Sequence, residues 1–116
     1  MAFRRGEIYL ANFNPPKGTE SGKIRPCLII QSDLLNDAQH PSTTVLPLTT
    51  QLIDDAEPLR YRITARHKLH VDSDVMIDQA RTIDNVRITS DSLLALEPAE
   101  MREVEEYLTI VLGFGD

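Results

Sequence analysis

The chain has 116 residues, 41% of them hydrophobic, and this length and composition predict one ordinary globular domain over residues 1–116. The formal net charge of −6 argues against a protein that binds nucleic acid regardless of sequence, and no apolar run approaches the roughly 18 residues of a membrane span. The one cysteine, Cys27, cannot form an internal disulfide and no signal-peptide segment is visible, so we expect a reducing, cytoplasmic location and no membrane partner.

Short apolar runs separated by proline, glycine and polar residues indicate a mainly β chain. Pro15 and Pro16 end the first run, and Pro47, inside the third, suggests an edge position or a bulge. Ser32 offers an N-cap for a short helical turn after the second run. Strands are expected at residues 7–13, 26–31, 43–50, 59–64, 74–78, 81–83 and 86–88.

The end of the chain predicts the clearest helix, over residues 98–112. Pro98 suits the first helical position, Glu100 lies where the helix dipole favours an anion, and Gly113 suits the C-terminal cap. Apolar residues recur at helical spacing along it, which indicates a face that packs on the core or on a subunit. Together these elements predict a small, strongly bent antiparallel sheet or partly open barrel with one helix packed on it.

Cations gather in two parts of the sequence. They are frequent in residues 1–30, and residues 60–70 carry Arg60, Arg62, Arg66 and Lys68 with two histidines and no acid. The acids lie mostly elsewhere, so the molecule could present a local basic face despite its negative net charge. A solvated surface of mixed charge is the plainer alternative.

The glycine-punctuated loop before the second strand is the most informative segment. It leads to Arg25, which stands at the start of an apolar strand where a guanidinium could bind a phosphate from a fixed position. The alternative is an arginine that reaches solvent or pairs with Glu20. Thr49 and Thr50 end another strand, where hydroxyls usually serve turns, and they gain a functional meaning only if the fold brings them to Arg25.

Other kinds of site have little support. His40, His67 and His70 lack the spacing and cysteine partners of a zinc site, and no phosphate-binding loop or nucleophile elbow occurs. Cys27 lies inside an apolar run, which predicts an inert core thiol.

Four motifs occur in one order: RGEIYLA at residues 5–11, PKGTESGKIRP at 16–26, VLPLT at 45–49 and DQARTID at 78–84. In this combination they resemble the MazF/PemK ribonuclease toxins of type II toxin–antitoxin pairs. The resemblance implies an SH3-like barrel of the CcdB/PemK type, a homodimer, and a cognate antitoxin with an acidic, disordered tail. It also implies an endoribonuclease that needs no metal or other cofactor, cuts single-stranded mRNA at short sequences and so inhibits translation and growth.

By the same resemblance, Arg25 and Thr49 are the catalytic pair. The implied reaction is attack of a ribose 2′-hydroxyl on the adjacent phosphorus, which leaves a 2′,3′-cyclic phosphate and a 5′-hydroxyl. The residues expected to bind RNA are Lys17, Thr19, Glu20, Lys23, Thr50, Asp78, Gln79 and Arg81.

Two points stay open in the sequence. Some members of the family carry an arginine with an acid/base role two positions before the aspartate of the DQxR segment, where this chain has Met76. Either Arg25 and Thr49 act with help from Glu20 or Asp78, or the reaction is slower. The alternative function, on the same fold, is that of the CcdB-like toxins, which bind DNA gyrase and cut nothing.

Overall fold

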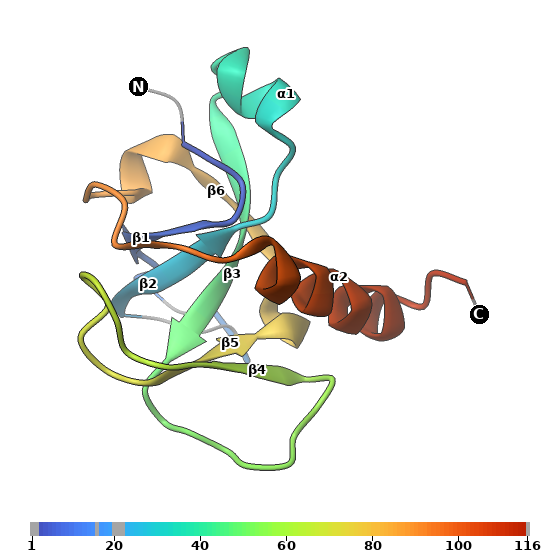
Figure 1. Cartoon of the computed structure of the whole chain (residues 1–116). Coiled ribbons are helices and arrows are strands. Elements are labelled where there is room, and N and C mark those ends of the chain that lie inside the picture. Colours follow the sequence, from blue (N-terminus) through green and yellow to red (C-terminus); the bar gives the residue numbers. More distant parts are fainter. Residues whose placement is uncertain (1–2, 16, 20–22, 116) are drawn as a thin grey trace.

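The computed structural model describes residues 3–15, 17–19 and 23–115 and shows a curled antiparallel sheet with a long helix against it (Figure 1). The mainly β fold with one C-terminal helix is therefore confirmed. The strands follow the order β4-β5-β3-β2-β1-β7, and β6 pairs with the other part of β3. The strands are β1 (Glu7–Asn12), β2 (Ile24–Ile29), β3 (Ser42–Thr49), β4 (Arg60–Ile63), β5 (Ser73–Met76), β6 (Arg81–Asp84) and β7 (Leu94–Ala95).

Strand β3 is the centre of the sheet. One of its edges pairs with β2, whereas its other edge pairs first with β6, over Ser42–Val45, and then with β5, over Leu48 and Thr49. Pro47, directly opposite Cys27 on β2, lies between those two pairings. The predicted edge position for Pro47 is wrong: the strand is central, but it changes partners at the residue that has no N–H to donate.

Side-chain alternation gives the sheet two apolar faces. Along β1, Ile8 belongs to one core cluster, whereas Tyr9 and Ala11 belong to the other, together with Phe13 directly after the strand. This is the division between two faces that period-2 alternation predicts. The first cluster is covered by α2 (Pro98–Leu112), which contributes the buried Met101 and Val104.

Helix α2 has the predicted ends. Glu97 and Glu100 form a reciprocal capping box around Pro98, and Gly113 takes a left-handed conformation with φ of 77°. Polar contacts also tie the helix to the rest of the fold. They join Arg5 to Glu105, Tyr61 to Glu103 and Arg66 to Glu100.

The shorter elements match the sequence less closely. Helix α1 (Asp33–Asp37) has the predicted cap, since Leu34 N donates to Ser32 Oγ at 3.1 Å. The strand expected at residues 74–78 ends at Met76 and gives way to the 3-10 turn η1 (Ile77–Gln79). The strand predicted at 86–88 is wrong. The side chain of Asp84 caps the 3-10 turn η2 (Asn85–Arg87) there by accepting from Val86 N.

Candidate active site

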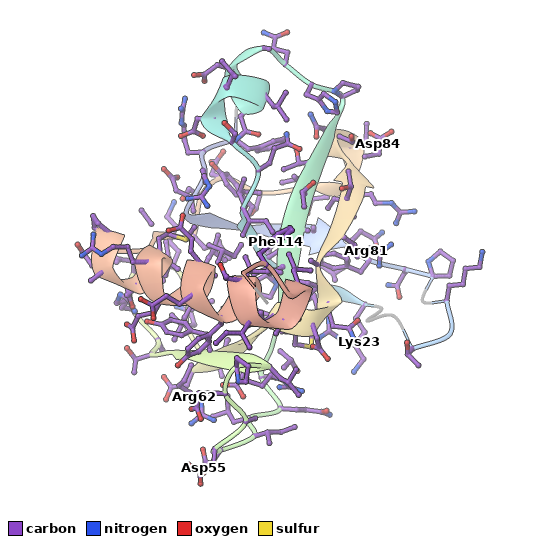
Figure 2. The ribbon with its side chains drawn as sticks, turned by 90° about the vertical axis from the view of Figure 1, so that its right-hand side faces the viewer. Lys23, Asp55, Arg62, Arg81, Asp84 and Phe114 are labelled. Carbon is purple, nitrogen blue, oxygen red and sulfur yellow. The ribbon has the colours of Figure 1, made fainter. Side chains whose placement is uncertain are left out.

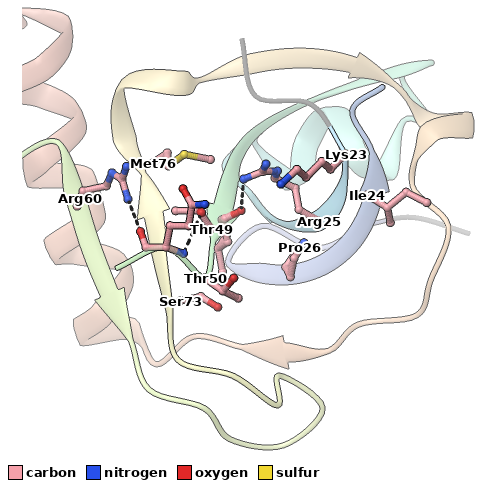
Figure 3. A pocket seen from close by; sticks show the side chains of 11 residues that line it. Lys23, Ile24, Arg25, Pro26, Thr49, Thr50, Arg60, Ser73 and Met76 are labelled. Atoms are coloured by element: carbon pink, nitrogen blue, oxygen red, sulfur yellow. Dashed lines mark hydrogen bonds between the residues drawn. The ribbon is translucent and has the colours of Figure 1, made fainter. Parts of the chain in front are cut away.

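The ends of neighbouring strands surround a pocket of about 340 Å³ that contains both predicted catalytic residues (Figure 3). Arg25 comes from β2 and Thr49 from β3. Lys23 and Thr50, both predicted to bind RNA, also line the pocket. The convergence on which the functional interpretation of the two threonines depended is thus present in the structure.

Arg25 is half-buried and held by the backbone of β3. Its Nη1 donates to the carbonyl oxygen of Leu48 at 3.1 Å, and burial lowers the pKa of the guanidinium from its ordinary value. Since a guanidinium has five N–H donors in a planar fork, it can contact the backbone and a phosphate at the same time. The alternative partner from the sequence, Glu20, lies outside the described residues.

Thr49 is positioned by the turn that comes after β3. Gln51 N donates to Thr49 Oγ1 at 3.2 Å, so the hydroxyl oxygen acts as an acceptor inside the protein. Its own proton can then be donated toward the pocket. Thr49 can therefore hydrogen-bond a phosphate oxygen or orient a ribose hydroxyl.

The entry to β2 is held from two directions. Lys23 has a left-handed backbone with φ of 73°, its N–H donates to Asn14 Oδ1 at 2.7 Å, and its carbonyl accepts from Phe13 N at 2.8 Å. Arg87 Nη1 donates to the carbonyls of Asn12 and Asn14 across the base of the same loop. These contacts fix the approach of the chain to Arg25.

Apart from Glu20, which lies outside the described residues, the other predicted RNA-binding residues do not line this pocket. Lys17 and Thr19 are exposed in the loop before β2, and Asp78 and Gln79 lie in η1, with Asp78 exposed. Arg81 starts β6, and its guanidinium carbon lies 5.4 Å from the centre of the Phe13 ring. Figure 2 shows Arg81 and Lys23 on the same side of the molecule.

Most of the basic 60–70 segment is neutralised within the fold. Arg62 pairs with the buried Asp74 and with Asp54, and Arg66 pairs with Glu100 on α2. From this segment Arg60 lines the pocket beside Arg25, and its Nη1 lies 3.5 Å from Asp74 Oδ2. Sequence reasoning counted Arg60 as part of a basic surface and missed its place in the pocket. The sequence signal that could have found it is the alternation of Arg60 with Tyr61, which places the arginine on the opposite face of the strand from the core.

Neither a reactive thiol nor a metal cluster is found in the described part of the chain. Burial raises the pKa of Cys27 to about 12, which keeps the thiol protonated and confirms the prediction of an inert core residue. Within residues 3–15, 17–19 and 23–115, no three histidine, cysteine, aspartate or glutamate side chains are placed to hold a metal ion. Among these residues no helix has the length and apolar character needed to cross a membrane.

Residues 4–112 match the family model described as "PemK-like, MazF-like toxin of type II toxin-antitoxin system". The chain belongs to this family. Among curated proteins it is similar to Endoribonuclease EndoA of Bacillus subtilis (strain 168), with 36% identity over 117 residues that cover 100% of this chain and 99% of EndoA.

Solved structures share the fold. MazF from Deinococcus radiodurans superposes with a TM-score of 0.81 at 22% identity, covering 98% of this chain and 99% of that one. A mycobacterial endoribonuclease in complex with its cognate antitoxin superposes with a TM-score of 0.77 at 20% identity, and 99% of each chain is covered. At these identities the likeness concerns the curled sheet and its terminal helix.

Proposed function

We propose that this toxin is an endoribonuclease that cleaves single-stranded RNA in the pocket between Arg25 and Thr49. The observation that carries the proposal is the meeting of a half-buried guanidinium and an available hydroxyl at the ends of two neighbouring strands. The name of the relative that is 36% identical, an endoribonuclease, supports the same class of activity.

The proposed reaction is an internal transesterification. The ribose 2′-oxygen forms a bond to the adjacent phosphorus, the bond from phosphorus to the 5′-oxygen breaks, and the products are a 2′,3′-cyclic phosphate and a 5′-hydroxyl. Arg25 binds the phosphate and stabilises the negative charge that grows on its oxygens. Thr49 orients the 2′-hydroxyl or a phosphate oxygen, which holds the reacting atoms close to the geometry of attack.

Metal independence is part of this proposal. The charge that a divalent ion would supply to the phosphate comes instead from a guanidinium whose position is fixed by Leu48. Lys23 and Thr50 lie beside the reacting group in the same pocket. The remaining predicted residues would bind flanking nucleotides, over the path from the loop before β2 to Arg81. They are Lys17, Thr19, Glu20, Asp78 and Gln79.

We further propose that the protein acts in the cytoplasm as a homodimer and is inhibited by a cognate antitoxin with an acidic tail. The mycobacterial neighbour was solved with its cognate antitoxin. Carboxylates of such a tail would compete with RNA phosphates for Arg25 and Arg60. Because Arg62 and Arg66 are already paired within the fold, charge reversal at Arg60 should weaken inhibition more than reversal at the other two arginines.

The direct test is incubation of the purified protein with a long transcript in EDTA. The proposal predicts discrete fragments with 2′,3′-cyclic phosphate and 5′-hydroxyl ends, and it predicts that an Arg25→Ala preparation that is equally folded leaves the transcript intact. An intact transcript with the wild-type protein would reject the ribonuclease and favour the non-cleaving, gyrase-binding type of toxin. Cleavage only after addition of Mg²⁺ would reject metal independence.

A further inference from the structure

The pocket contains a second guanidinium, that of Arg60, which enters from the side opposite to Arg25. Figure 3 shows Arg60 and Arg25 on two sides of the pocket with Thr49 and Met76 between them. The order of strands explains the arrangement. Arg25 is on β2 and Arg60 on β4, and the two strands that separate them, β3 and β5, provide Thr49 and Met76.

Strand register directs Arg60 to this face of the sheet. Thr49 lies opposite Asp74, and Asp74 lies opposite Arg62, so these three residues form one row across β3, β5 and β4. The next row on the same face, two residues further along β5, pairs Met76 with Arg60. Neighbouring strands are roughly 4.8 Å apart, so the reach of an arginine side chain is enough to bring its guanidinium from β4 back toward β3.

Asp74 holds Arg60 in place without neutralising it fully. This buried carboxylate accepts from Arg62 Nε at 2.6 Å and from Ile53 N at 2.9 Å, whereas Arg60 Nη1 is 3.5 Å away. Arg62 has a further partner in Asp54 at 2.9 Å. Both carboxylates of the cluster, Asp54 and Asp74, therefore pair mainly with Arg62. Arg60, the arginine of the cluster that lines the pocket, is the less neutralised of the two.

The direction of the Arg60 side chain leaves donors for a ligand. Its contacts with Asp74 and with the carbonyl of Gln51, the latter at 3.3 Å, are both made by Nη1. The Nε and Nη2 atoms of Arg60 donate no hydrogen bond to any residue that the structure describes. A guanidinium with one nitrogen anchored and two donors on its other edge matches the geometry of a phosphate.

We propose that Arg60 is a second phosphate-binding catalytic residue, which contacts the RNA backbone from the side opposite to Arg25. The proposal rests on the proposed ribonuclease function and adds a residue to it. With two guanidiniums on opposite sides, the charge that develops on the phosphate oxygens is stabilised from both directions, and the sugar–phosphate chain is held across Thr49. Asp74 is then a positioning residue, because it orients Arg60 and through Ile53 N also holds the loop after β3.

The other explanation is a purely structural Arg60, which would tie the loop after β3 to β4 through Gln51 and Asp74. The two explanations predict different effects of removing the charge. Loss of a structural arginine changes the free energy of unfolding and leaves the salt dependence of RNA binding as it was. Loss of a phosphate-binding arginine changes RNA binding and cleavage in a protein whose stability is nearly unaltered.

The test compares Arg60→Gln with two arginine-to-glutamine controls. Arg62→Gln removes the stronger partner of Asp74 but leaves the pocket lining unchanged, and Arg102→Gln removes a charge from the exposed side of α2. Three quantities are measured for each folded variant. They are the cleavage rate of the transcript in EDTA, the affinity for a 2′-fluoro copy of the segment that the wild-type protein cuts, and the urea midpoint. The 2′-fluoro RNA has no attacking hydroxyl, so binding is observed without cleavage.

We expect Arg60→Gln to lower kcat by about a hundredfold, the loss found for one well-placed donor to a developing charge. Its plot of log affinity against log salt concentration should be shallower by about 0.7, the contribution of one phosphate contact on a single strand. Arg62→Gln should lower the urea midpoint more than Arg60→Gln does, with little change in the salt slope. Arg102→Gln should change none of the three quantities.

If Arg60→Gln cleaves and binds like the wild-type protein, or if its loss of activity accompanies only a loss of folded protein, the proposal is overturned. An unchanged salt slope together with slower cleavage would also overturn the phosphate contact. Failure of the wild-type protein to cut RNA is a different result, because it rejects the ribonuclease itself. Arg60→Lys adds a graded case: it should restore the salt slope, since the charge returns, but only part of kcat, since the planar fork is lost.

Discussion

Arg25 differs from a surface arginine in a way that changes what its removal should do. One of the two interpretations of Arg25 from the sequence was a side chain at a strand start that reaches solvent, and truncation of such a residue would cost almost no stability. In the structure the side chain is half-buried and donates to Leu48 O, so its loss removes a hydrogen bond to the backbone. Its contributions to stability and to activity can nevertheless be separated, because they differ in size.

Replacing Arg25 with alanine should abolish most cleavage and leave the protein folded. We expect a stability loss of about 1 kcal/mol for the lost hydrogen bond and a loss of roughly a hundredfold to a thousandfold in kcat for the lost charge. Arg25→Lys should recover little activity because the ammonium lacks the planar fork. Urea unfolding and gel-based cleavage rates measure the two effects. Cleavage by Arg25→Ala within a few-fold of wild type would contradict the assigned role.

Thr49 allows its hydroxyl to be tested apart from its volume. Thr49→Ser keeps the Oγ that accepts from Gln51 N and should retain much of the activity. Thr49→Val has nearly the same volume but no hydroxyl, and it should lose most cleavage by removing a donor to the substrate. The matched control is Thr50→Val in the same pocket, which should have the smaller effect on kcat. Equal activity of the serine and valine variants would mean that the hydroxyl has no part in the reaction.

Asp74 gives a residue-scale prediction about pH. Burial by itself would raise the pKa of Asp74, but hydrogen bonds from Arg62 and Ile53 N outweigh it, and the net pKa lies below its usual value. A carboxyl whose pKa is lower in the folded state stabilises the protein above its unfolded pKa, near 3.9, and this contribution is lost as the pH falls through the folded value. Stability should therefore decrease below about pH 4.

The Asp74→Asn variant tests whether Asp74 causes this loss of stability in acid. At pH 7 the variant should be less stable than wild type by about 2 kcal/mol, because it removes the buried anion to which Arg62 and Ile53 N donate, and its further loss in acid should be shallower. Asp54→Asn is the matched control, because Asp54 pairs with the same Arg62 from an exposed position and should cost at most about 1 kcal/mol. Urea midpoints from pH 3 to pH 7 give both curves. Parallel curves for wild type and Asp74→Asn would assign the acid sensitivity to other groups.

At the scale of elements, local signals predicted most of the structure. Alternation in β1, the caps of α1 and α2 and the apolar spacing of α2 are properties of neighbouring residues, so the sequence shows them directly. The partners of Pro47 and Asp74 are not. Whether a proline in a strand is at an edge depends on which strands pair on each side. The ion pairs of Asp74 depend on β4, which places Arg60 and Arg62 beside it.

The site follows the same division between local signals, which the sequence shows, and long-range pairing, which it does not. Arg25 and Thr49 stand out through their motifs, but their proximity depends on the pairing of β2 with β3, which is a long-range property. Arg60 was harder to recognise, because it belongs to none of the four motifs and its place in the pocket comes from the register of β4 on β5. A cation on a short alternating strand is more often solvated than functional, so the sequence alone gives no reason to place Arg60 in the pocket.

The start of α2 should be a stability determinant of the whole helix. Glu100 accepts from Glu97 N at 2.9 Å in the capping box and also pairs with Arg66. Glu100→Ala should cost about 1–2 kcal/mol, the size of a lost cap together with a partly buried ion pair. Glu100→Gln keeps the cap and should cost less, and Glu106→Ala, from an exposed helix position, should cost almost nothing. Thermal unfolding of the three variants measures the series. Equal losses for Glu100→Ala and Glu106→Ala would contradict the capping role.

At the scale of the whole molecule, one part of the surface is more apolar than a soluble monomer needs. Toward the end of α2, Ile110 is 60% exposed, Leu112 53% and Phe114 68%. These residues lie close together in the sequence, at the end of a helix whose inner side is already packed on the sheet. A cluster of this kind is typical of a subunit contact. Of the two contacts expected for the predicted homodimer, part of the terminal helix or the strand edges, it favours the helix.

The protein should therefore sediment as a dimer at micromolar concentration, and Leu112→Glu should weaken that dimer. Burying one such side chain contributes roughly 1.5–3 kcal/mol, so placing a carboxylate there should raise the dissociation constant by at least about tenfold. Leu34→Glu is the matched control, because Leu34 is 79% exposed on α1, away from α2. A wild-type protein that is monomeric at this concentration would contradict the dimer. A dimer that Leu112→Glu leaves intact and Leu34→Glu disrupts would instead assign the contact to the side of the molecule that carries α1.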